Sequence, residues 1–399
     1  MTDTRLYPVQ ARPAIQNLGG SLIREVANSG MGRADVLPFW FGESDMATAQ
    51  FIRDEAARSL AQGETFYSQN LGRPYLRERI ANYLSELHGR SIAPERIAVM
   101  SSGVTGLMIA SEMLLSAQDR VVVVTPLWPN ITEIPKILSA EVERVPLRVS
   151  DGRWTLDLDR LLDALTPGTR ALIVNSPNNP TGWTIDDHSV QVILSHCRKH
   201  GIWIVCDDVY ERLVYDSNRR SAPSFLAYYE EGDRIISVNS FSKAWSMTGW
   251  RAGWMVVPEA LTADLAKIIE YNFSCVFEPV QRAAAIALER GEPEIARLRE
   301  SLSHTRALLS QALTSLPGVQ VPEAGGAMYV FFRIAGQDDS LELAKRLVSE
   351  VGLGLAPGAA FGPEGNGWLR WCHAVSVDAT LLDGVDRLSR FLDRGHSHD

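Results

Sequence analysis

The chain has 399 residues, of which 45% are hydrophobic and 22% are charged, and its formal net charge is −9. This balance is typical of a globular protein with two packing units. The acidic charge argues against a nucleic-acid or anionic-membrane partner, since neutralising phosphates needs clustered Lys and Arg. No apolar run approaches the ~20 residues of a membrane span, and the start MTDTRLYPVQARP lacks the apolar core of a secretory signal. We therefore expect a cytoplasmic protein.

Alternating apolar runs and helical patterns fill the middle of the chain. Apolar, mostly β-branched runs predict strands at 96–100, 120–126, 141–147, 170–177, 202–208, 234–242 and 252–258. Helical patterns stand between several of them, including 107–116 and 186–201. Strands separated by helices favour parallel pairing with both faces of the sheet covered. We predict an α/β fold with a central, mostly parallel, seven-stranded sheet flanked by helices.

The pattern changes after about residue 260. Helices are predicted near 259–271, 277–290, 293–314 and 340–350, with strands at 325–334, 353–358 and 367–374 and a final helix. These elements predict a smaller α+β unit. The N-terminal segment 1–45 shows little regular structure of its own, and we expect it to join that unit. The predicted division is a large domain over 46–290 and a small domain formed by 1–45 and 291–399.

Five polar turns follow five of the predicted strands. They are SSGVTG (101–106), LWPN (127–130), NNPTG (178–182), DDVY (207–210) and SFSK (240–243). In an open α/β sheet the ligand lies beyond the carboxyl ends of the strands. We therefore expect these five turns to meet at one edge of one sheet and to form the functional site.

Lys243 stands in one of these turns, eight residues before Arg251. Desolvation and a nearby cation lower the pKa of an amine and free its lone pair for covalent chemistry. An exposed lysine at the start of a helix is the alternative interpretation. Asp207 ends a buried run, where a carboxylate could pair with a cationic ring nitrogen, and Tyr210 could donate from its hydroxyl.

The other turns suit a flat, phosphorylated ligand. SSGVTG opens a helix whose free N–H groups could bind a phosphate, and Trp128 could stack on a ring. The Asn179–Pro180 bond is a candidate cis peptide. No Walker, dinucleotide-binding or nucleophile-elbow motif is present.

Metal ligation is not predicted. His196 and His200 have the spacing of a helical zinc pair, but Cys197 occupies the position where that motif needs glutamate. The four cysteines are scattered and form no CxxC pair, so we expect reduced thiols: Cys197, Cys206, Cys275 and Cys372. The histidine-rich end RGHSHD is interpreted as a frayed terminus.

Taken in order, these motifs resemble those of the class I/II aminotransferases of pyridoxal-phosphate fold type I, the group that includes aspartate aminotransferase. The matching stretches are FWFGESDMAT, TFYSQNLGRPYLRERIANYL, SSGVTG, PLWPN, NSPNNPTG, CDDVYERL, SFSKAWSMTGWRAGW and GGAMYVFF. Single motifs are weak, but NNPTG, DDVY and SFSK…R in this order are specific. The resemblance covers nearly the whole chain.

The resemblance implies pyridoxal 5′-phosphate as the cofactor and a catalytic role for three residues. Lys243 would form the covalent imine and then shuttle a proton, while Asp207 would keep the pyridinium nitrogen protonated. Tyr210 would bond the phenolic oxygen of the ring together with Asn179. The remaining cofactor contacts would come from Gly103, Val104, Thr105, Trp128, Ser240, Arg251 and, across a homodimer interface, Tyr67.

The resemblance also implies how the substrate binds. Arg370 would bind its carboxylate, next to Asn179, and Gly42 would let the backbone approach it. The residues that follow Arg370 differ from the family's usual small, polar continuation, so Arg333 is a rival for the carboxylate.

The implied reaction is the exchange of an amino group between an L-amino acid and a 2-oxo acid by a ping-pong mechanism. A carbon–sulfur β-lyase of the same fold, similar to cystathionine β-lyase, is the alternative enzyme, because LPFWFGESDMAT resembles those relatives too. A ligand-sensing regulator is a third possibility, but the family pattern starts near residue 37 and leaves no room for a DNA-binding unit.

The sequence leaves the side-chain specificity open. Aromatic residues near both ends of the chain could line an apolar pocket or belong to the core: Phe39, Trp40, Phe41 and Trp371. A dicarboxylate substrate would need a second arginine, which the partner chain could supply. Arg12, Arg24 and Arg33 are candidates, because they lie in the N-terminal region that borders such sites in relatives.

Overall fold

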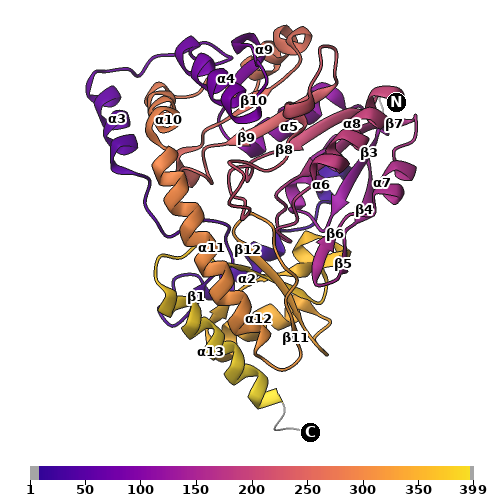
Figure 1. Cartoon of the computed structure of the whole chain (residues 1–399), viewed down its shortest axis with the longest axis vertical. Coiled ribbons are helices and arrows are strands. Elements are labelled where there is room, and N and C mark those ends of the chain that lie inside the picture. Colours follow the sequence, from indigo (N-terminus) through magenta and orange to yellow (C-terminus); the bar gives the residue numbers. More distant parts are fainter. Residues whose placement is uncertain (1–8, 396–399) are drawn as a thin grey trace, which may run out of the picture.

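A seven-stranded sheet forms the centre of the computed structural model, which describes residues 9–395 (Figure 1). Its strands lie in the order β2-β10-β9-β8-β7-β3-β4. Their bounds are β2 (Ile97–Met100), β3 (Arg120–Thr125), β4 (Glu141–Pro146), β7 (Thr169–Asn175), β8 (Trp203–Asp207), β9 (Ile235–Ser240) and β10 (Gly253–Val256). The predicted fold class and the seven predicted strands are confirmed.

Only β10 runs against the other strands of this sheet. It pairs antiparallel with β2 and β9, whereas the β4-β3-β7-β8-β9 pairs are all parallel. The start of β10 therefore lies at the edge where its neighbours end, with Gly253 opposite Ser240. This reversal brings Arg251, two residues before β10, to the same edge as the five polar turns.

Helices cover both faces of the large sheet because its strands are apolar on both sides. Val121 and Val123 pack with α5 (Gly103–Leu114), α6 (Pro129–Ile137) and α9 (Thr262–Glu270) on one face. Val122 and Val124 point to the opposite face and join the larger core. The helices that contribute to that core include α3 (Gln50–Ala61), α4 (Pro74–His88), α7 (Leu158–Ala164), α8 (Asp187–His200) and α10 (Glu278–Arg290).

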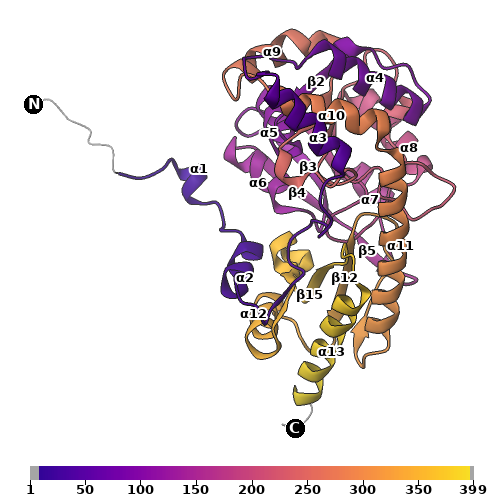
Figure 2. The same cartoon turned by 90° about the vertical axis from the view of Figure 1, so that its left-hand side faces the viewer.

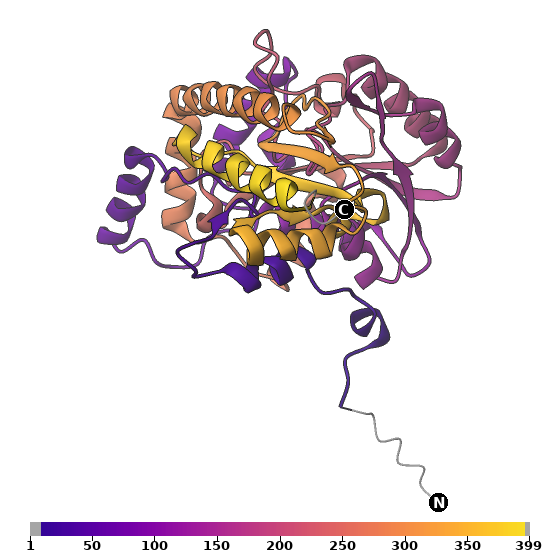
Figure 3. The same cartoon turned by 90° about the horizontal axis from the view of Figure 1, so that it is seen from below.

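A second, four-stranded sheet lies below the first in Figure 1. Its order is β11 (Val319–Gln320), β12 (Tyr329–Ile334), β15 (Trp368–Cys372) and β14 (Ala356–Pro357). The long helix α11 (Glu292–Thr314) runs from one sheet region to the other (Figure 1). Seen from below, α13 (Asp378–Gly395) lies between α11 and α12 (Ser340–Val351) (Figure 3).

The N-terminal segment has more regular structure than the sequence predicted. It contains α1 (Pro13–Gln16), α2 (Leu22–Gly30) and β1 (Leu37–Pro38) (Figure 2). α1 lies beside α6, where the Arg12 guanidinium donates to the Ile137 carbonyl at 2.6 Å. The Ser21 hydroxyl caps α2 by accepting from the Arg24 N–H at 3.3 Å. Ile23, Val26 and Ala27 form its buried stripe. The prediction missed this cap and this spacing.

β1 pairs in parallel with β13 (Leu353–Gly354), which ties the N-terminal segment to the C-terminal part of the chain. The division into domains at 46–290 and at 1–45 with 291–399 stays a prediction.

The sequence analysis also missed the hairpin of β5 (Arg148–Ser150) and β6 (Arg153–Thr155). Short 3-10 turns occur at η1 (Pro94–Arg96), η2 (Phe225–Tyr228), η3 (Thr248–Trp250), η4 (Glu259–Leu261), η5 (Gly358–Phe361) and η6 (Pro363–Gly365). Within residues 9–395, no helix is both long enough and apolar enough to cross a bilayer.

Candidate active site

The five polar turns meet around one cavity of about 260 Å³ at the carboxyl edge of the large sheet. The second sheet and the N-terminal segment close its other side. Of the predicted site residues, those that line it are Gly42, Gly103, Val104, Trp128, Asn179, Asp207, Tyr210, Ser240, Lys243, Arg251 and Arg370. Thr105 and Tyr67 do not line it. The topology rule therefore located the cavity correctly from the order of strands and turns alone.

Lys243 points its amine across the cavity toward the N-terminal segment. Its Nζ donates to the Gly42 carbonyl at 2.5 Å and lies 5.6 Å from the centre of the Tyr210 ring. The pKa of Lys243 is lowered to about 8, mainly by desolvation and also by the charge of Arg370, against the opposing effects of Cys372, Glu43 and Asp207. A substantial fraction of this amine is therefore neutral near pH 8, as a nucleophile or base requires.

Asp207 ends β8 at the floor of the cavity and is 2% exposed. Its carboxylate accepts a long hydrogen bond from the Val209 N–H at 3.4 Å, and its carbonyl accepts from the Asn175 amide at 3.1 Å. Burial raises the pKa of Asp207 to about 7, although the Val209 N–H and the Lys243 charge oppose the rise. A cation placed against this carboxylate would restore its charge.

A pair of buried tyrosines joins the two sheets at the cavity. The hydroxyls of Tyr210 and Tyr329 lie 2.5 Å apart, and desolvation raises the pKa of both, that of Tyr329 to about 12. Tyr329 comes from β12. A Cβ added at Gly42 would lie 1.9 Å from the Tyr329 hydroxyl oxygen, so this position accepts only glycine.

Arg370 is the buried arginine of the cavity. Its Nη1 donates to Asn179 Oδ1 at 2.8 Å, its Nη2 donates to the Trp40 carbonyl at 2.5 Å, and its guanidinium lies 4.4 Å from the Tyr329 ring centre. Within the described part of the chain its buried Nε has no hydrogen-bond partner. Arg333 is exposed and donates to Gln320 at 2.5 Å instead. Arg370, and not Arg333, therefore lies where a ligand carboxylate could reach it.

The start of α5 forms the end of the cavity beside β9 and β10. Gly103 and Val104 occupy its first two positions, where N–H groups have no acceptor within the helix. A Cβ on Gly103 would lie 3.1 Å from a methyl group of Val209, which makes this approach tight. The Thr105 N–H, in contrast, already donates to the Ser102 hydroxyl at 3.1 Å. Thr105 is therefore less suited to an anion than the sequence suggested.

Ser240 and Arg251 stand opposite this helix start. The Ser240 hydroxyl lies 3.1 Å from the Ala252 carbonyl, to which it can donate its one proton, and 2.8 Å from the Ser242 hydroxyl. Arg251 has a left-handed φ of 54° and donates from Nη1 to the Thr248 carbonyl at 2.6 Å. Free N–H groups at a helix start, a hydroxyl and a guanidinium together are the donor set that binds a phosphate.

Comparisons with known proteins agree with this geometry. The family model for "Aminotransferase class I and II" matches residues 34–388. The chain belongs to this aminotransferase family. It is 30% identical over 396 residues to an aspartate aminotransferase of Pyrococcus horikoshii, covering 98% of this chain and 99% of that one. It is 29% identical over 383 residues to aromatic-amino-acid aminotransferase 2 of Thermococcus litoralis, covering 95% and 97%.

Solved structures show the same relationship for the fold of this aminotransferase. The crystal structure of an aspartate aminotransferase from Thermotoga maritima superposes with a TM-score of 0.88 at 29% identity, covering 96% of this chain and 100% of that one. The recognition of the family and of its fold from the ordered motifs is thereby confirmed.

Several residues that line the cavity of this aminotransferase were not predicted from the sequence: Ile23, Leu107, Asn175, Val209, Ser242, Thr248 and Tyr329. Tyr329 could have been found, since it lies in the matched stretch GGAMYVFF. Of the four aromatic residues considered for an apolar pocket, only Phe41 lines the cavity. The other three are core residues with at most 3% exposure: Phe39, Trp40 and Trp371.

Tyr67 is 89% exposed and lies outside the cavity of its own chain. Phe66 beside it is 82% exposed and Tyr271 is 91% exposed. The Ser68 N–H donates to Cys275 Sγ at 3.4 Å, which brings the segments of Tyr67 and Tyr271 together. The role predicted for Tyr67 requires a second copy of the chain.

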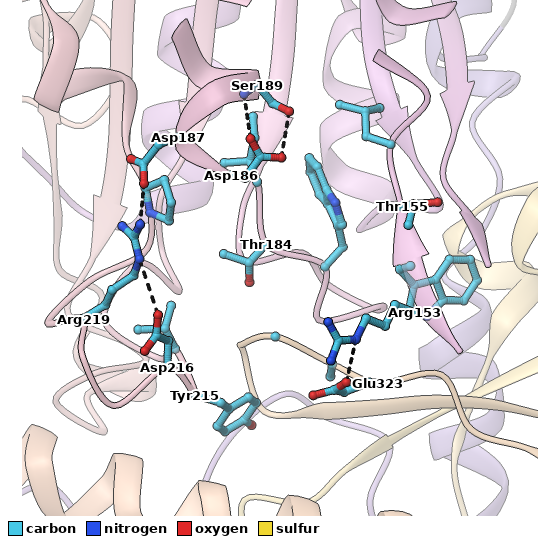
Figure 4. Close-up of a pocket in the computed structure, with 18 of the residues that line it drawn as sticks. Arg153, Thr155, Thr184, Asp186, Asp187, Ser189, Tyr215, Asp216, Arg219 and Glu323 are labelled. Atoms are coloured by element: carbon cyan, nitrogen blue, oxygen red, sulfur yellow. Dashed lines mark hydrogen bonds and ion pairs between the residues drawn. The ribbon is translucent and has the colours of Figure 1, made fainter. Parts of the chain in front are cut away.

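A larger cavity of about 690 Å³ lies elsewhere on the aminotransferase, and its charged groups are paired (Figure 4). Arg219 forms ion pairs with Asp187 and Asp216, and Arg153 pairs with Glu323 at 2.8 Å. Among its lining residues in the described chain there is no lysine, histidine or cysteine. The pKa shifts in this cavity move its groups away from neutral pH, since burial of Asp186 is outweighed by hydrogen bonds from Ser189, which lower its pKa, and burial raises the pKa of Tyr215.

A metal site is also absent from residues 9–395, where no group of three or more His, Cys, Asp or Glu side chains could hold an ion. His196 Nε2 lies 2.8 Å from the Leu165 carbonyl and its ring lies beside that of His200. Residues 396–399 of the histidine-rich tail lie outside the described part.

Proposed function

We propose that this aminotransferase binds pyridoxal 5′-phosphate at Lys243 and exchanges an amino group between an L-amino acid and a 2-oxo acid by a ping-pong mechanism. One observation carries the proposal. The same cavity is lined by a desolvated lysine with a pKa of about 8, a buried aspartate and a buried arginine. These groups are what covalent binding, a ring cation and a substrate carboxylate need.

The residues of the cavity fit pyridoxal phosphate. Asp207 has a buried carboxylate whose charge a protonated ring nitrogen would stabilise. Trp128 offers an indole for stacking, and Tyr210 and Asn179 offer hydrogen-bond donors. The phosphate would bind at the start of α5, at the Gly103 and Val104 N–H groups with Ser240 and Arg251. When bound, the cofactor supplies the electron sink that stabilises a carbanion at the substrate Cα.

Arg370 and Asn179 would hold the substrate. The guanidinium of Arg370 is fixed by Asn179 and by the Trp40 carbonyl, so it binds the α-carboxylate without first losing side-chain entropy. Gly42 lets its own carbonyl and the Tyr329 hydroxyl approach the same space. A substrate held at this end presents its Cα–H bond in a fixed orientation.

Lys243 would move the proton. As a neutral amine it takes the proton from the substrate Cα, and as an ammonium group it returns a proton at the carbon that receives the amino group. Its pKa of about 8 suits both directions near neutral pH. The Gly42 carbonyl, which accepts from Nζ at 2.5 Å, would keep the amine above the substrate.

The matched relatives are named as aminotransferases, which favours transamination over carbon–sulfur β-elimination and over ligand sensing. We further propose that the chain is a cytoplasmic homodimer of two-domain subunits, with the division given above. The exposed surface of Phe66, Tyr67 and Tyr271 supports a partner, and Tyr67 would reach the phosphate bound by the other subunit.

A half-reaction tests the proposed function. The holoenzyme is mixed with an amino acid in the absence of any 2-oxo acid, and the products are counted. We expect one equivalent of 2-oxo acid per subunit, no ammonia, and renewed turnover when a 2-oxo acid is added. Continuous release of pyruvate and ammonia from cystathionine without an acceptor would instead identify a β-lyase.

A further inference from the structure

Four apolar side chains line the active-site cavity beside its polar groups. We define the apolar wall as Ile23, Phe41, Val104 and Leu107, all of which line the cavity. Ile23 and Phe41 come from the N-terminal segment, and Val104 and Leu107 come from the first turns of α5. Ile23 and Leu107 are buried, and Val104 and Phe41 are partly buried. The wall is built by two segments that meet only in the folded chain.

Each cation that lines the cavity already has a binding partner in the proposed function. Among the described lining residues they are Lys243, Arg251 and Arg370. In the proposed function these three hold the cofactor aldehyde, the phosphate and the substrate α-carboxylate. None remains on this chain for a second carboxylate on the substrate side chain.

A neighbouring groove of about 810 Å³ shares Val104 with the cavity. The cations that line the groove are neutralised by their own partners. Lys136 pairs with Glu133 at 2.6 Å, and Arg144 pairs with Glu364 at 2.7 Å. Among its described lining residues, the groove therefore adds no cation without a carboxylate partner.

Of the three N-terminal arginines considered for a second carboxylate, Arg12 donates to the Ile137 carbonyl and Arg33 pairs with Asp35. Arg24 lies beside the wall. Its guanidinium lies 5.7 Å from the centre of the Phe41 ring, and the residue is exposed. It lines neither the cavity nor the groove. A guanidinium in water at this position gains little from a carboxylate compared with one inside the cavity.

We propose that the amino donor of this enzyme carries an apolar side chain, aliphatic or aromatic, and that aspartate and glutamate are poor donors. A side-chain carboxylate against the apolar wall would lose its hydration without gaining a cation. An apolar side chain there gains from leaving water. The inference rests on the proposed function, and it separates this chain from the relatives that are named for aspartate.

The donor preference is measured in single-turnover half-reactions of the holoenzyme, so that the charge of an acceptor does not enter. Phenylalanine, leucine and methionine are compared with aspartate and glutamate by the apparent second-order rate constant. We expect at least about tenfold faster reaction with the apolar donors, because burying an unpaired charge is costly. Calorimetric titration with 3-phenylpropionate and with maleate gives an independent readout, and 3-phenylpropionate is expected to bind more tightly.

Variants at the wall sharpen the test. Ile23→Lys places a cation in the wall and should raise the rate with aspartate relative to phenylalanine by about tenfold, because the added charge pairs with the substrate carboxylate. Ile23→Met keeps the wall apolar and should leave the ratio unchanged. Arg24→Gln should also leave the ratio unchanged. If Ile23→Lys does not fold, the inference is still tested by two measurements on the wild type. These are the ratio of the rate constants for apolar and acidic donors, and the titrations with 3-phenylpropionate and maleate.

Faster reaction of the wild type with aspartate, or tighter binding of maleate, would overturn the inference. If a preference for aspartate were found and then lost in Arg24→Gln, Arg24 would be the cation that pairs with the side-chain carboxylate. If the preference for aspartate persisted in Arg24→Gln, it would point to a cation from the partner subunit. A holoenzyme that transaminates no donor would refute the proposed function instead, so the two failures are distinguishable.

Discussion

Two cavities of the molecule differ in how their charged groups are satisfied. The larger one, of about 690 Å³, holds arginines and carboxylates that pair with each other at the surface (Figure 4). The smaller one, of about 260 Å³, holds Lys243 and Asp207, which desolvation shifts toward their neutral forms. An acid and an amine whose pKa values lie close to neutral pH, and not volume, therefore distinguish the cavity suited to chemistry.

The difference originates in the fold. The smaller cavity lies where parallel strands end and the reversed strand β10 begins, so it collects polar side chains on buried backbone. The larger cavity is lined by loops and by β6, α8 and α11, and the ion pairs of Arg153 and Arg219 there are at least one-third exposed to water. Ion pairs in such a setting contribute little to stability.

The largest effect is expected from Lys243→Ala. Removing the amine removes both the covalent attachment and the proton carrier, so turnover should fall by at least about 10⁴-fold. Stopped-flow absorbance in the half-reaction measures this loss. Lys267→Ala, which changes an exposed lysine paired with Asp264, is the matched control and should retain full activity. Substantial activity in Lys243→Ala would contradict the assignment.

Asp207→Asn should separate activity from stability. Turnover should fall by about 10²–10³-fold, because the charge opposite the ring is lost. The apoprotein should become more stable at pH 8, by on the order of 2 to 4 kcal/mol, because the wild type buries a carboxylate whose pKa is raised from 3.8 to about 7. The penalty in the wild type is present above pH 7 and is relieved as the pH falls from 7 to 3.8.

Denaturant unfolding of the apo forms at several pH values measures this effect. The advantage of the Asn variant should shrink from pH 7 toward pH 4. An Asn variant that is less stable than the wild type at pH 8 would show that the Asp207 carboxylate is well solvated or paired in the free protein.

Arg370→Gln should reduce kcat/KM by about 10²-fold, because a bidentate charged contact with the α-carboxylate is lost. Arg333→Gln is the control on the neighbouring strand and should change kcat/KM by less than about twofold, since Arg333 is exposed. Steady-state kinetics of both variants give the comparison. The reverse pattern would restore Arg333 as the carboxylate ligand.

The pH dependence of cofactor uptake by the apoenzyme reports the pKa of Lys243. Imine formation needs the neutral amine, so the rate should rise about tenfold per pH unit below pH 8 and level off above it. Absorbance of the bound cofactor follows the reaction. A rate that keeps rising beyond pH 10 would mean that the lysine is fully hydrated.

The smallest effect is expected in the larger cavity. Arg219→Ala removes its ion pairs with Asp187 and Asp216, which are all at least one-third exposed. The free energy of unfolding should change by less than about 1 kcal/mol, and kcat/KM should stay the same. A large loss of activity in this variant would show that the larger cavity takes part in the reaction.

The sequence predicted the large sheet well, because its strands are uninterrupted apolar runs and its functional residues follow them directly. Lys243 and Asp207 could be found in this way, since each stands in a turn after a buried strand. Residues brought in by long-range packing were harder to predict. Tyr329 and Ile23 reach the cavity only because β12 and the N-terminal segment close over it, and local patterns do not encode that contact.

Helix α2 was missed for a different reason. Its cap at Ser21 and its short buried stripe are weak signals in a nine-residue helix. Thr105 shows that hydrogen-bond partners are also hard to predict from sequence. Its position in the turn suggested a free N–H group, but this N–H donates to the Ser102 hydroxyl that caps α5. Whether a donor is free depends on its neighbours in three dimensions.

Borohydride reduction of the holoenzyme followed by peptide mass analysis tests the central claim most directly. The account predicts that the peptide containing Lys243 carries a pyridoxyl group and that no other lysine does so in comparable yield. A reduced protein with an unmodified Lys243, or a purified chain that takes up no pyridoxal phosphate, would contradict it.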